Sequence, residues 1–381
     1  LKFFPALNFL DRGISRGQYN YVFQDPNSTP KRATTLKLDY NINPNNIVVF
    51  GYSIFKDVSE GAFGTTTASG NWPIMRKNWT STGKSTTLRY TRIISPSVLN
   101  EFSFGWLNQP ADNFYAESEL KKMQRDTVGF RIGQFTPKAN PLNIIPNATF
   151  GGVPGAANIQ TEGRFPLYNR YHLVNFSDNV TLTRGGHNLK AGTYIETFYR
   201  RQKKSVNFVG TFNFAQSSTN PLDTGYAYAN AALGVFNTYS EISGEAWMRV
   251  RTGGYEFFAQ DNWKATRKLT LDYGLRMYFL LPIWDMDDFM AGFVQDRYDP
   301  AKAMRLIAPG LDAQRRRVGV NPVNGQIYSA AQIGAIAPGA GNSSNGMLVA
   351  GADKNYPRAL VDNRGIQWGP RIGFAYDLTG N

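Results

Sequence analysis

The sequence predicts an all-β fold, part of a transmembrane antiparallel β-barrel, from two observations. Four separate segments share one plan, in which an alternating strand is followed by a short polar turn and a second alternating strand. Each strand is apolar on one face and polar on the other, with the period of two that distinguishes strands from helices. Such strands suit a wall between lipid and water, and about 9 to 11 residues suffice to cross a membrane.

The hairpin at residues 255–279 is the clearest of the four. Its strands are joined by a turn at residues 265–267, and apolar side chains alternate with polar ones along the second strand. We therefore predict two opposite faces. The lipid-facing residues of this strand are Leu271, Tyr273, Leu275 and Met277, and the lumen-facing residues are Asp272 and Arg276.

Two hairpins nearer the N-terminus follow the same rule. The first covers residues 35–54 around a turn at 43–46, where Pro44 fits because it donates no backbone hydrogen bond. The second covers residues 86–107 around a turn at 95–97. They add Lys37 and Asp39 to the predicted lumen-facing residues, and Phe50, Tyr52, Phe102, Phe104 and Trp106 to the lipid-facing residues.

The fourth hairpin covers residues 172–200 around a turn at 184–187. Its second strand places Lys190 and Glu196 toward the lumen, whereas Asp178 interrupts the apolar face of its first strand.

A last alternating strand at residues 370–377 brings the total to nine. Single-chain bacterial barrels have an even number of strands and are closed. We therefore expect a fragment of a barrel.

Short turns alternate with long connections along the chain. Bacterial barrels have this asymmetry, with short periplasmic turns and long extracellular loops. Residues 206–214 and 226–235 also alternate and are expected to extend strands beyond the membrane. Residues 301–364 show no sustained period and are expected to form an extracellular loop.

The composition agrees with one barrel domain over residues 1–381. Mean hydropathy is −0.37, and no run reaches the 18 or so apolar residues that a membrane helix needs. Modest hydropathy is expected of a barrel because every second residue faces the lumen. Aromatic residues make up 14% of the chain, which fits aromatic girdles at the membrane interfaces, although sugar-binding β proteins are also rich in aromatics.

The formal net charge is +13, and basic residues cluster in predicted outer loops or strand tips. The clusters are Lys121 with Lys122, Arg200 and Arg201 with Lys203 and Lys204, and Arg315 to Arg317. A charge run is most often a solvated surface, and we favour a surface facing anionic lipid headgroups over a specific anion site. No nucleic-acid-binding module accompanies the clusters, so no nucleic-acid partner is expected.

The sequence lacks the residue patterns of catalytic and metal sites. It has no cysteine, its two histidines lack a metal-ligand spacing, and no phosphate-binding or nucleophile motif occurs. Asp285, Asp287 and Asp288 match no EF-hand loop and are expected to form an exposed acidic loop. We therefore expect no catalytic residue, cofactor, metal ion or enzymatic activity.

Four short motifs occur in a fixed order along nearly the whole chain. They are residues 4–8 with 20–21, residues 185–192 (GGHNLKAG), residues 260–276 (QDNWKATRKLTLDYGLR) and residues 370–377 (PRIGFAYD). Together they resemble the barrels of TonB-dependent outer-membrane receptors, specifically the Oar-like group with large outer loops. Each motif alone is weak, but four in order are fairly specific to that family.

The resemblance implies a barrel of about 22 strands, plugged by an N-terminal domain, that imports a scarce ligand with force from an inner-membrane TonB complex. The implied partners are outer-membrane lipid, an unknown extracellular ligand, and the energy-coupling complex, which acts through the plug. No plug or TonB box precedes Leu1. The chain is therefore expected to be a fragment that lacks the plug and the C-terminal strands.

Two functions remain open. In the first, the long outer loops meet a siderophore, glycan or peptide ligand, and the polar lumen conducts it once the plug moves. In the second, the protein is a surface binding or adhesion protein, or a passive porin, whose loops carry the function. A plug with a TonB box in the full-length gene favours the first, and a filled barrel without a plug favours the second.

Overall fold

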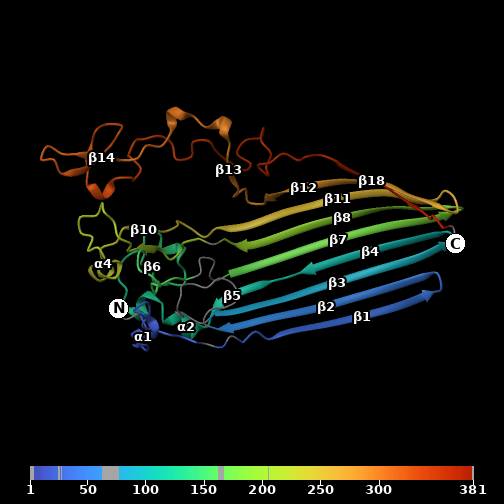
Figure 1. Cartoon of the computed structure of the whole chain (residues 1–381), viewed down its shortest axis with the longest axis horizontal. Helices are drawn as coiled ribbons and strands as arrows, with labels where there is room; N and C mark the ends of the chain where they lie inside the picture. The colour runs from blue at the N-terminus through green and yellow to red at the C-terminus, as the bar shows by residue number, and fades with distance from the viewer. Residues whose placement is uncertain are drawn as a thin grey trace.

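The structure is a computed structural model that describes residues 4–24, 26, 28–61, 77–161, 167–204 and 206–379. Its main feature is an antiparallel sheet of ten strands, nine of which lie side by side in chain order (Figure 1). The nine are β1 (Lys31–Asn43), β2 (Asn46–Gly61), β3 (Lys77–Ser95), β4 (Val98–Asn108), β7 (Leu167–Arg184), β8 (His187–Lys203), β11 (Trp247–Lys264), β12 (Leu269–Asp285) and β18 (Gln367–Tyr376). The all-β prediction is confirmed.

The other elements are short and lie before the sheet or in its connections. The strands are β5 (Ala111–Tyr115), β6 (Asn147–Thr149), β9 (Thr211–Asn213), β10 (Thr238–Ser240), β13 (Ala291–Phe293), β14 (Ala308–Leu311), β15 (Arg317–Val320), β16 (Ile327–Tyr328) and β17 (Met347–Val349). The α-helices are α1 (Arg12–Ser15), α2 (Glu117–Lys121), α3 (Arg125–Val128) and α4 (Ala227–Leu233), and the 3-10 helices are η1 (Pro137–Ala139), η2 (Gln295–Arg297), η3 (Pro300–Lys302) and η4 (Ala330–Gln332). None of the helices in the described part of the chain has the length and apolar character needed to cross a membrane.

All four predicted hairpins are present, and their short turns lie at one end of the sheet. The turns of β1–β2, β3–β4, β7–β8 and β11–β12 are at the right of Figure 1, whereas the long connections leave from the opposite end. The connection from β2 to β3 passes through residues 62–76, which lie outside the described residues, as do the last two residues of the chain. The predicted alternation of short turns and long connections is confirmed.

The register of the strands gives the sheet one apolar face. Residues directly opposite each other on neighbouring strands lie on the same side of a sheet. One row of such neighbours runs unbroken from β1 to β12, and all its members are apolar or aromatic: Leu38, Phe50, Leu88, Phe104, Phe176, Ile195, Tyr255 and Phe279. We call the side that bears this row the apolar face and the other side the polar face.

Two prolines account for irregularities in the sheet. Pro110 separates β4 from β5, yet both strands pair with β3 and β7, so they act as one strand interrupted where a proline removes a backbone donor. An extra residue near Pro282 shifts the register of β12, so that Trp284 instead of Ile283 lies opposite Arg251. Beyond this bulge, odd and even residues of β12 exchange faces.

The sheet is open in the described structure. Within the main path, β1 pairs with β2 and β18 pairs with β12, and neither has a second partner among the described residues. Hydrocarbon cannot satisfy the unpaired N–H and C=O groups of such edges. Closure into a barrel requires that these two edges pair with each other or with further strands.

Two segments that were expected to extend strands fold differently. Residues 226–235 contain helix α4, because four alanines favour a helix and the buried Ala227 and Asn230, three residues apart, share one helix face. Residues 206–214 contain only the three-residue strand β9. Phe208 and Val209 are both buried although they are consecutive, so packing on two sides overrides the alternation there. Both predictions were wrong in these details.

Two adjacent substitutions in β12 test which face of the sheet contacts lipid. Leu275 lies on the apolar face opposite Ala259 and Pro370, whereas Arg276 lies on the polar face with its Nε 3.2 Å from Glu256 Oε2. A cation near the membrane midplane costs about 2 to 4 kcal/mol, so we expect Leu275→Arg to impair assembly and Arg276→Leu to assemble nearly normally. The shift in gel mobility between unheated and boiled full-length protein measures assembly. Equal yields of the two variants would show that the faces are assigned wrongly.

Candidate functional site

The six residues predicted to face the lumen all lie on the polar face. They are Lys37, Asp39, Lys190, Glu196, Asp272 and Arg276. The structure does not bring all of them together. Lys37 and Asp39 lie on the edge strand β1, where Lys37 Nζ is 3.3 Å from Asp39 Oδ2. Lys190, Asp272 and Arg276 lie toward the other edge, on β8 and β12. Their exposure to a lumen stays a prediction.

A cavity of about 390 Å³ opens on the polar face between β8, β11, β12 and β18. We call it the cationic cavity, because three of its polar lining residues are basic. These polar residues are Lys190, Gln260, Arg276, Tyr278 and Arg371. Gly274 and Gly369 also line the cavity, and a Cβ atom at either position would collide with Gln260 or Tyr278, respectively. The two glycines therefore let the side chains of Gln260 and Tyr278 lie close against the neighbouring backbone.

The cationic cavity carries an excess of positive charge. Arg276 pairs with Glu256, and Arg371 Nη2 lies 3.1 Å from Asp272 Oδ1. Lys190 has no ion pair within the described part of the chain. Arginine guanidinium groups bind carboxylates and phosphates through paired N–H donors, and lysine adds a mobile point charge. The arrangement is suited to an anionic group.

Arg371 is missing from the residues predicted from sequence. Its alternation with Ile372 places it on the polar face, and that signal was available. Its proximity to Asp272 was not, because the two residues are 99 positions apart and meet only through the pairing of β12 with β18.

All nine residues predicted to face lipid lie on the apolar face. They are Phe50, Tyr52, Phe102, Phe104, Trp106, Leu271, Tyr273, Leu275 and Met277. Asp178 interrupts this face, and its Oδ1 accepts a hydrogen bond of 2.6 Å from Asn100 Nδ2 on the neighbouring strand. That bond reduces the cost of a carboxylate among apolar side chains. Contact of this face with lipid stays a prediction.

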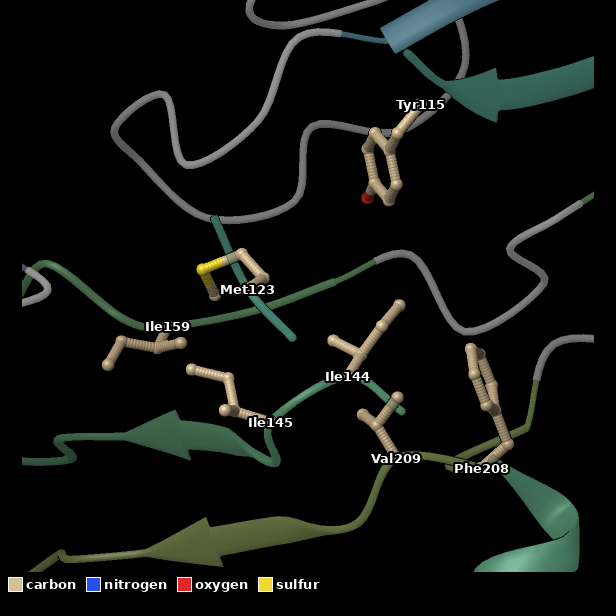
Figure 2. Packing of buried hydrophobic residues seen from close by; sticks show 7 residues of the cluster. All are labelled: Tyr115, Met123, Ile144, Ile145, Ile159, Phe208 and Val209. Carbon is tan, nitrogen blue, oxygen red and sulfur yellow. The ribbon is translucent and has the colours of Figure 1, made fainter. Parts of the chain in front are cut away.

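Two long connections fold together into a unit with its own core, at the end of the sheet away from the short turns. We call residues 115–160 and 206–246 the outer unit. Its core is a cluster of seven buried side chains (Figure 2): Tyr115, Met123, Ile144, Ile145, Ile159, Phe208 and Val209. A small sheet joins the two connections, because β9 pairs with β6 and β10. The outer unit therefore presents a packed surface.

Buried polar groups hold the outer unit together. The Arg125 guanidinium donates from Nη1 to the Ile132 carbonyl at 2.6 Å and from Nε to the Ile144 carbonyl at 3.2 Å. Asn140 Nδ2 donates to the same Ile144 carbonyl at 2.7 Å. Because buried polar groups are costly unless they are hydrogen-bonded, these bonds fix the path of residues 125–144.

Aromatic rings extend from this core to the surface. Phe150 stacks on Tyr228 and on Phe214, with ring centroids 4.4 and 5.7 Å apart. Phe135 is 86% exposed, with its ring centroid 5.9 Å from that of Tyr239. Exposed rings of this kind provide flat apolar surfaces on which a ligand ring can stack.

Asp285 at the end of β12 and Asp287 and Asp288 just beyond it do not form an exposed loop, so that prediction was wrong. Asp285 is only 2% exposed, and its carboxylate accepts hydrogen bonds from the backbone N–H groups of Arg249 and Asp287. The side chain of Asp287 pairs with the Arg249 guanidinium, and that of Asp288 with Arg358. The hydrogen bond from Arg249 lowers the pKa of Asp287. The arginines that neutralise this cluster come from β11 and from the segment before β18, which the local sequence cannot reveal.

The two histidines make contacts within the sheet. His187 Nδ1 lies 2.7 Å from Asp261 Oδ2, and its ring stacks on Trp263. His172 stacks on Tyr199. Among the described residues, no group of three or more His, Cys, Asp or Glu side chains is arranged to hold a metal ion.

Comparisons with known proteins agree with this architecture. The family described as outer membrane beta barrel domain matches residues 1–381. No curated protein matches the chain significantly.

Three solved structures are similar to the chain at low identity. The outer membrane transporter YddB from Escherichia coli is 8% identical, with a TM-score of 0.37 over 66% of this chain and 27% of that protein. The copper transporter OprC is 12% identical, with a TM-score of 0.34 over 68% and 30%. The ferric-catecholate import receptor Fiu from E. coli K12 is 11% identical, with a TM-score of 0.43 over 94% and 42%. The chain thus spans less than half the length of each.

Ile144→Ala tests whether the outer unit is held by its own core. Ile144 is fully buried, and truncation of a buried isoleucine to alanine costs about 2 to 5 kcal/mol. We expect limited proteolysis to cleave the outer unit faster, while the heat-dependent gel shift of the sheet stays unchanged. Ile132→Ala is the matched control, because Ile132 lies in the same connection and is 60% exposed. Equal cleavage of both variants would contradict a packed core.

The Arg249–Asp287 pair predicts how the outer end of β12 responds to acid. The pKa of Asp287 is lowered in the folded state, so the stabilisation is complete above the ordinary carboxyl pKa and is lost as pH falls through the folded value. Hydrogen exchange of residues 285–289, corrected for its intrinsic pH dependence, should stay constant from about pH 8 to pH 5 and rise below about pH 4. Asp287→Asn should raise it at neutral pH. A transition near pH 6 would contradict this assignment.

Proposed function

This chain belongs to the outer membrane beta barrel domain family, and from that membership we propose that it is part of a TonB-dependent transporter that takes up a scarce ligand. The protein is located in the outer membrane. In the proposal, the short turns lie in the periplasm and the outer unit lies outside the cell. The chain supplies a wall and a binding surface, and no catalytic step is assigned to it.

The cationic cavity is the observation that carries the proposal. Lys190, Arg276 and Arg371 line one recess on the polar face, and such a recess is suited to binding a ligand. Its excess positive charge favours ligands that carry carboxylate, phosphate or other acidic groups. The order of the four family-like motifs supports the same assignment.

The proposed route begins at the outer unit, whose exposed rings such as Phe135 meet the ligand first. The ligand then passes along the polar face to the cationic cavity. In this proposal the lumen is plugged by a separate domain, and an inner-membrane TonB complex supplies the force that moves it.

A surface binding or adhesion protein, or a passive porin, is the second candidate. The packed core of the outer unit supports binding at the surface, because a rigid surface loses little conformational entropy when it binds a partner. In this alternative the sheet is only an anchor or an open pore. A plug with a TonB box in the full-length gene would separate the two candidates.

Uptake by cells that carry the full-length gene tests active transport. A panel of radiolabelled siderophores, acidic oligosaccharides and peptides is offered to cells with and without the energy-coupling complex. We expect at least one ligand to accumulate only when the complex is intact. Accumulation at the same rate in both strains would refute active transport and favour the passive pore.

The same assay tests the cationic cavity. Lys190→Gln combined with Arg371→Gln should reduce the uptake rate by about tenfold, because the double variant removes the Lys190 cation and leaves the Asp272 carboxylate without its Arg371 partner, so that the cavity repels an anionic ligand. Lys37→Gln is the matched control, since Lys37 lies on the polar face but on the distant strand β1. An equal loss in the control would indicate a general effect of charge.

A further inference from the structure

Four arginines lie on the apolar face near the end of the sheet that leads into the long connections. Arg170 on β7 is directly opposite Arg201 on β8, which is directly opposite Arg249 on β11. Arg251 follows two residues along β11. The pairing of β7, β8 and β11 shows no register shift between these arginines and the apolar row. Strand alternation therefore puts all four on the same face as that row.

Like charges directly opposite each other in a sheet repel, and two of the four arginines form ion pairs. Arg170 makes two hydrogen bonds to the Asp112 carboxylate, of 2.6 and 3.2 Å. Arg249 pairs with Asp287. Arg201 and Arg251 form no ion pair in the described part of the chain, although Arg201 is close enough to Asp287 to contribute to the lowered pKa of that carboxyl group.

Aromatic rings hold the two arginines that form no ion pair in place. The Arg201 guanidinium carbon lies 4.7 Å from the centroid of the Trp247 ring, and that of Arg251 lies 5.8 Å from the Tyr199 ring. Both arginines are exposed. A guanidinium group that stacks on a ring keeps its in-plane N–H donors free, and these donors match the oxygens of a phosphate.

Strand geometry places these arginines at the level of lipid headgroups. From Leu182 to Val174 the apolar face of β7 spans about 27 Å of strand, which a tilt of about 40° reduces to roughly 21 Å along the membrane normal. Arg251 lies one row of residues beyond Val174, and Arg201 lies two rows beyond it. These rows are about 26 and 31 Å from Leu182, and the apolar band of a barrel is about 25 Å tall. The two guanidinium groups therefore lie just outside the hydrocarbon.

We propose that Arg201 and Arg251 bind the phosphate groups of the lipid that forms the outer leaflet. The site continues the apolar face upward, so a lipid bound there can place its acyl chains along the apolar row while its phosphate meets the two guanidinium groups. This continuity favours a lipid headgroup over a free phosphate ion. The inference rests on the predicted contact of the apolar face with lipid and on the proposed position of the outer unit outside the cell, but it does not depend on transport.

A binding measurement on full-length protein in detergent tests the site. The probe is diphosphoryl lipid A added in mixed micelles. Arg201→Gln combined with Arg251→Gln should weaken its binding by about tenfold. Arg200→Gln is the matched control, because Arg200 is the next residue but lies on the polar face, where its Nε donates to Asn169 Oδ1. It should bind lipid A as the unmodified protein does.

A lysine double variant tests the site even if the glutamine double variant does not assemble. Arg201→Lys combined with Arg251→Lys keeps both charges but removes the paired N–H donors, and it should bind lipid A with intermediate affinity. The gel shift between unheated and boiled samples verifies assembly of each variant.

Three results would overturn the proposal. The first is that the assembled double variants bind lipid A as tightly as the unmodified protein does. The second is that Arg200→Gln loses as much lipid A binding as the glutamine double variant. The third is that inorganic phosphate displaces lipid A and binds as tightly on its own. The last result would assign the site to free phosphate. Because no uptake is measured, a failure here leaves the transport proposal standing, and a failure of transport leaves this site standing.

Discussion

Backbone hydrogen bonding in a medium that offers no partners is the constraint on which the rest of this structure depends. Hydrocarbon cannot form hydrogen bonds with an N–H or C=O group, and in the sheet these groups pair with one another in a continuous antiparallel ladder from β1 to β18. The prolines lie where they do not interrupt this ladder. Pro44 and Pro96 lie in short turns, Pro110 marks the break between β4 and β5, and Pro370 lies on the edge strand β18. Each position is one where a missing donor costs little.

The same ladder decides the chemistry of both faces, because side chains alternate with a period of two. The apolar row spans eight strands that share no local sequence, and it forms only if every register is correct. The polar face is built by the same registers. There the pairing of β12 with β18 brings Arg371 beside Asp272 and completes the cationic cavity.

At the end of the sheet where the long connections leave, backbone groups no longer have to pair within a regular ladder. Side-chain packing determines the fold there. Beyond the bulge at Pro282 the faces of β12 are reversed and Asp285 is buried, where its carboxylate accepts hydrogen bonds from three backbone N–H groups. Residues from two connections share the core around Ile144. Charged residues gather at this boundary between sheet and outer unit. Some are neutralised by ion pairs, as in Arg249 with Asp287, and others rest on aromatic rings.

The sequence by itself determined the strands, the turns and the two faces. Alternation is a local property, and a short polar turn leaves the two strands of a hairpin little choice of partner. The six residues predicted to face the lumen therefore share one side of the sheet, and the nine predicted to face lipid share the other. The alternation of residues 226–235 predicts a strand, but this alanine-rich segment forms a helix. The helix is more stable than an isolated strand because alanine favours helices and because Ala227 and Asn230 are buried on one helix face.

Only the tertiary structure decided which distant residues meet. Side chains from different hairpins or connections combine in four places. These are the core of the outer unit, the ion pairs of Asp287 and Asp288, the cationic cavity, and the group of four arginines on β7, β8 and β11. No local pattern encodes such meetings, since they depend on the register of strands that are far apart in the sequence and on the bulge at Pro282. The reason is physical: alternation fixes the direction of a side chain, whereas its neighbours are fixed by the pairing of whole strands.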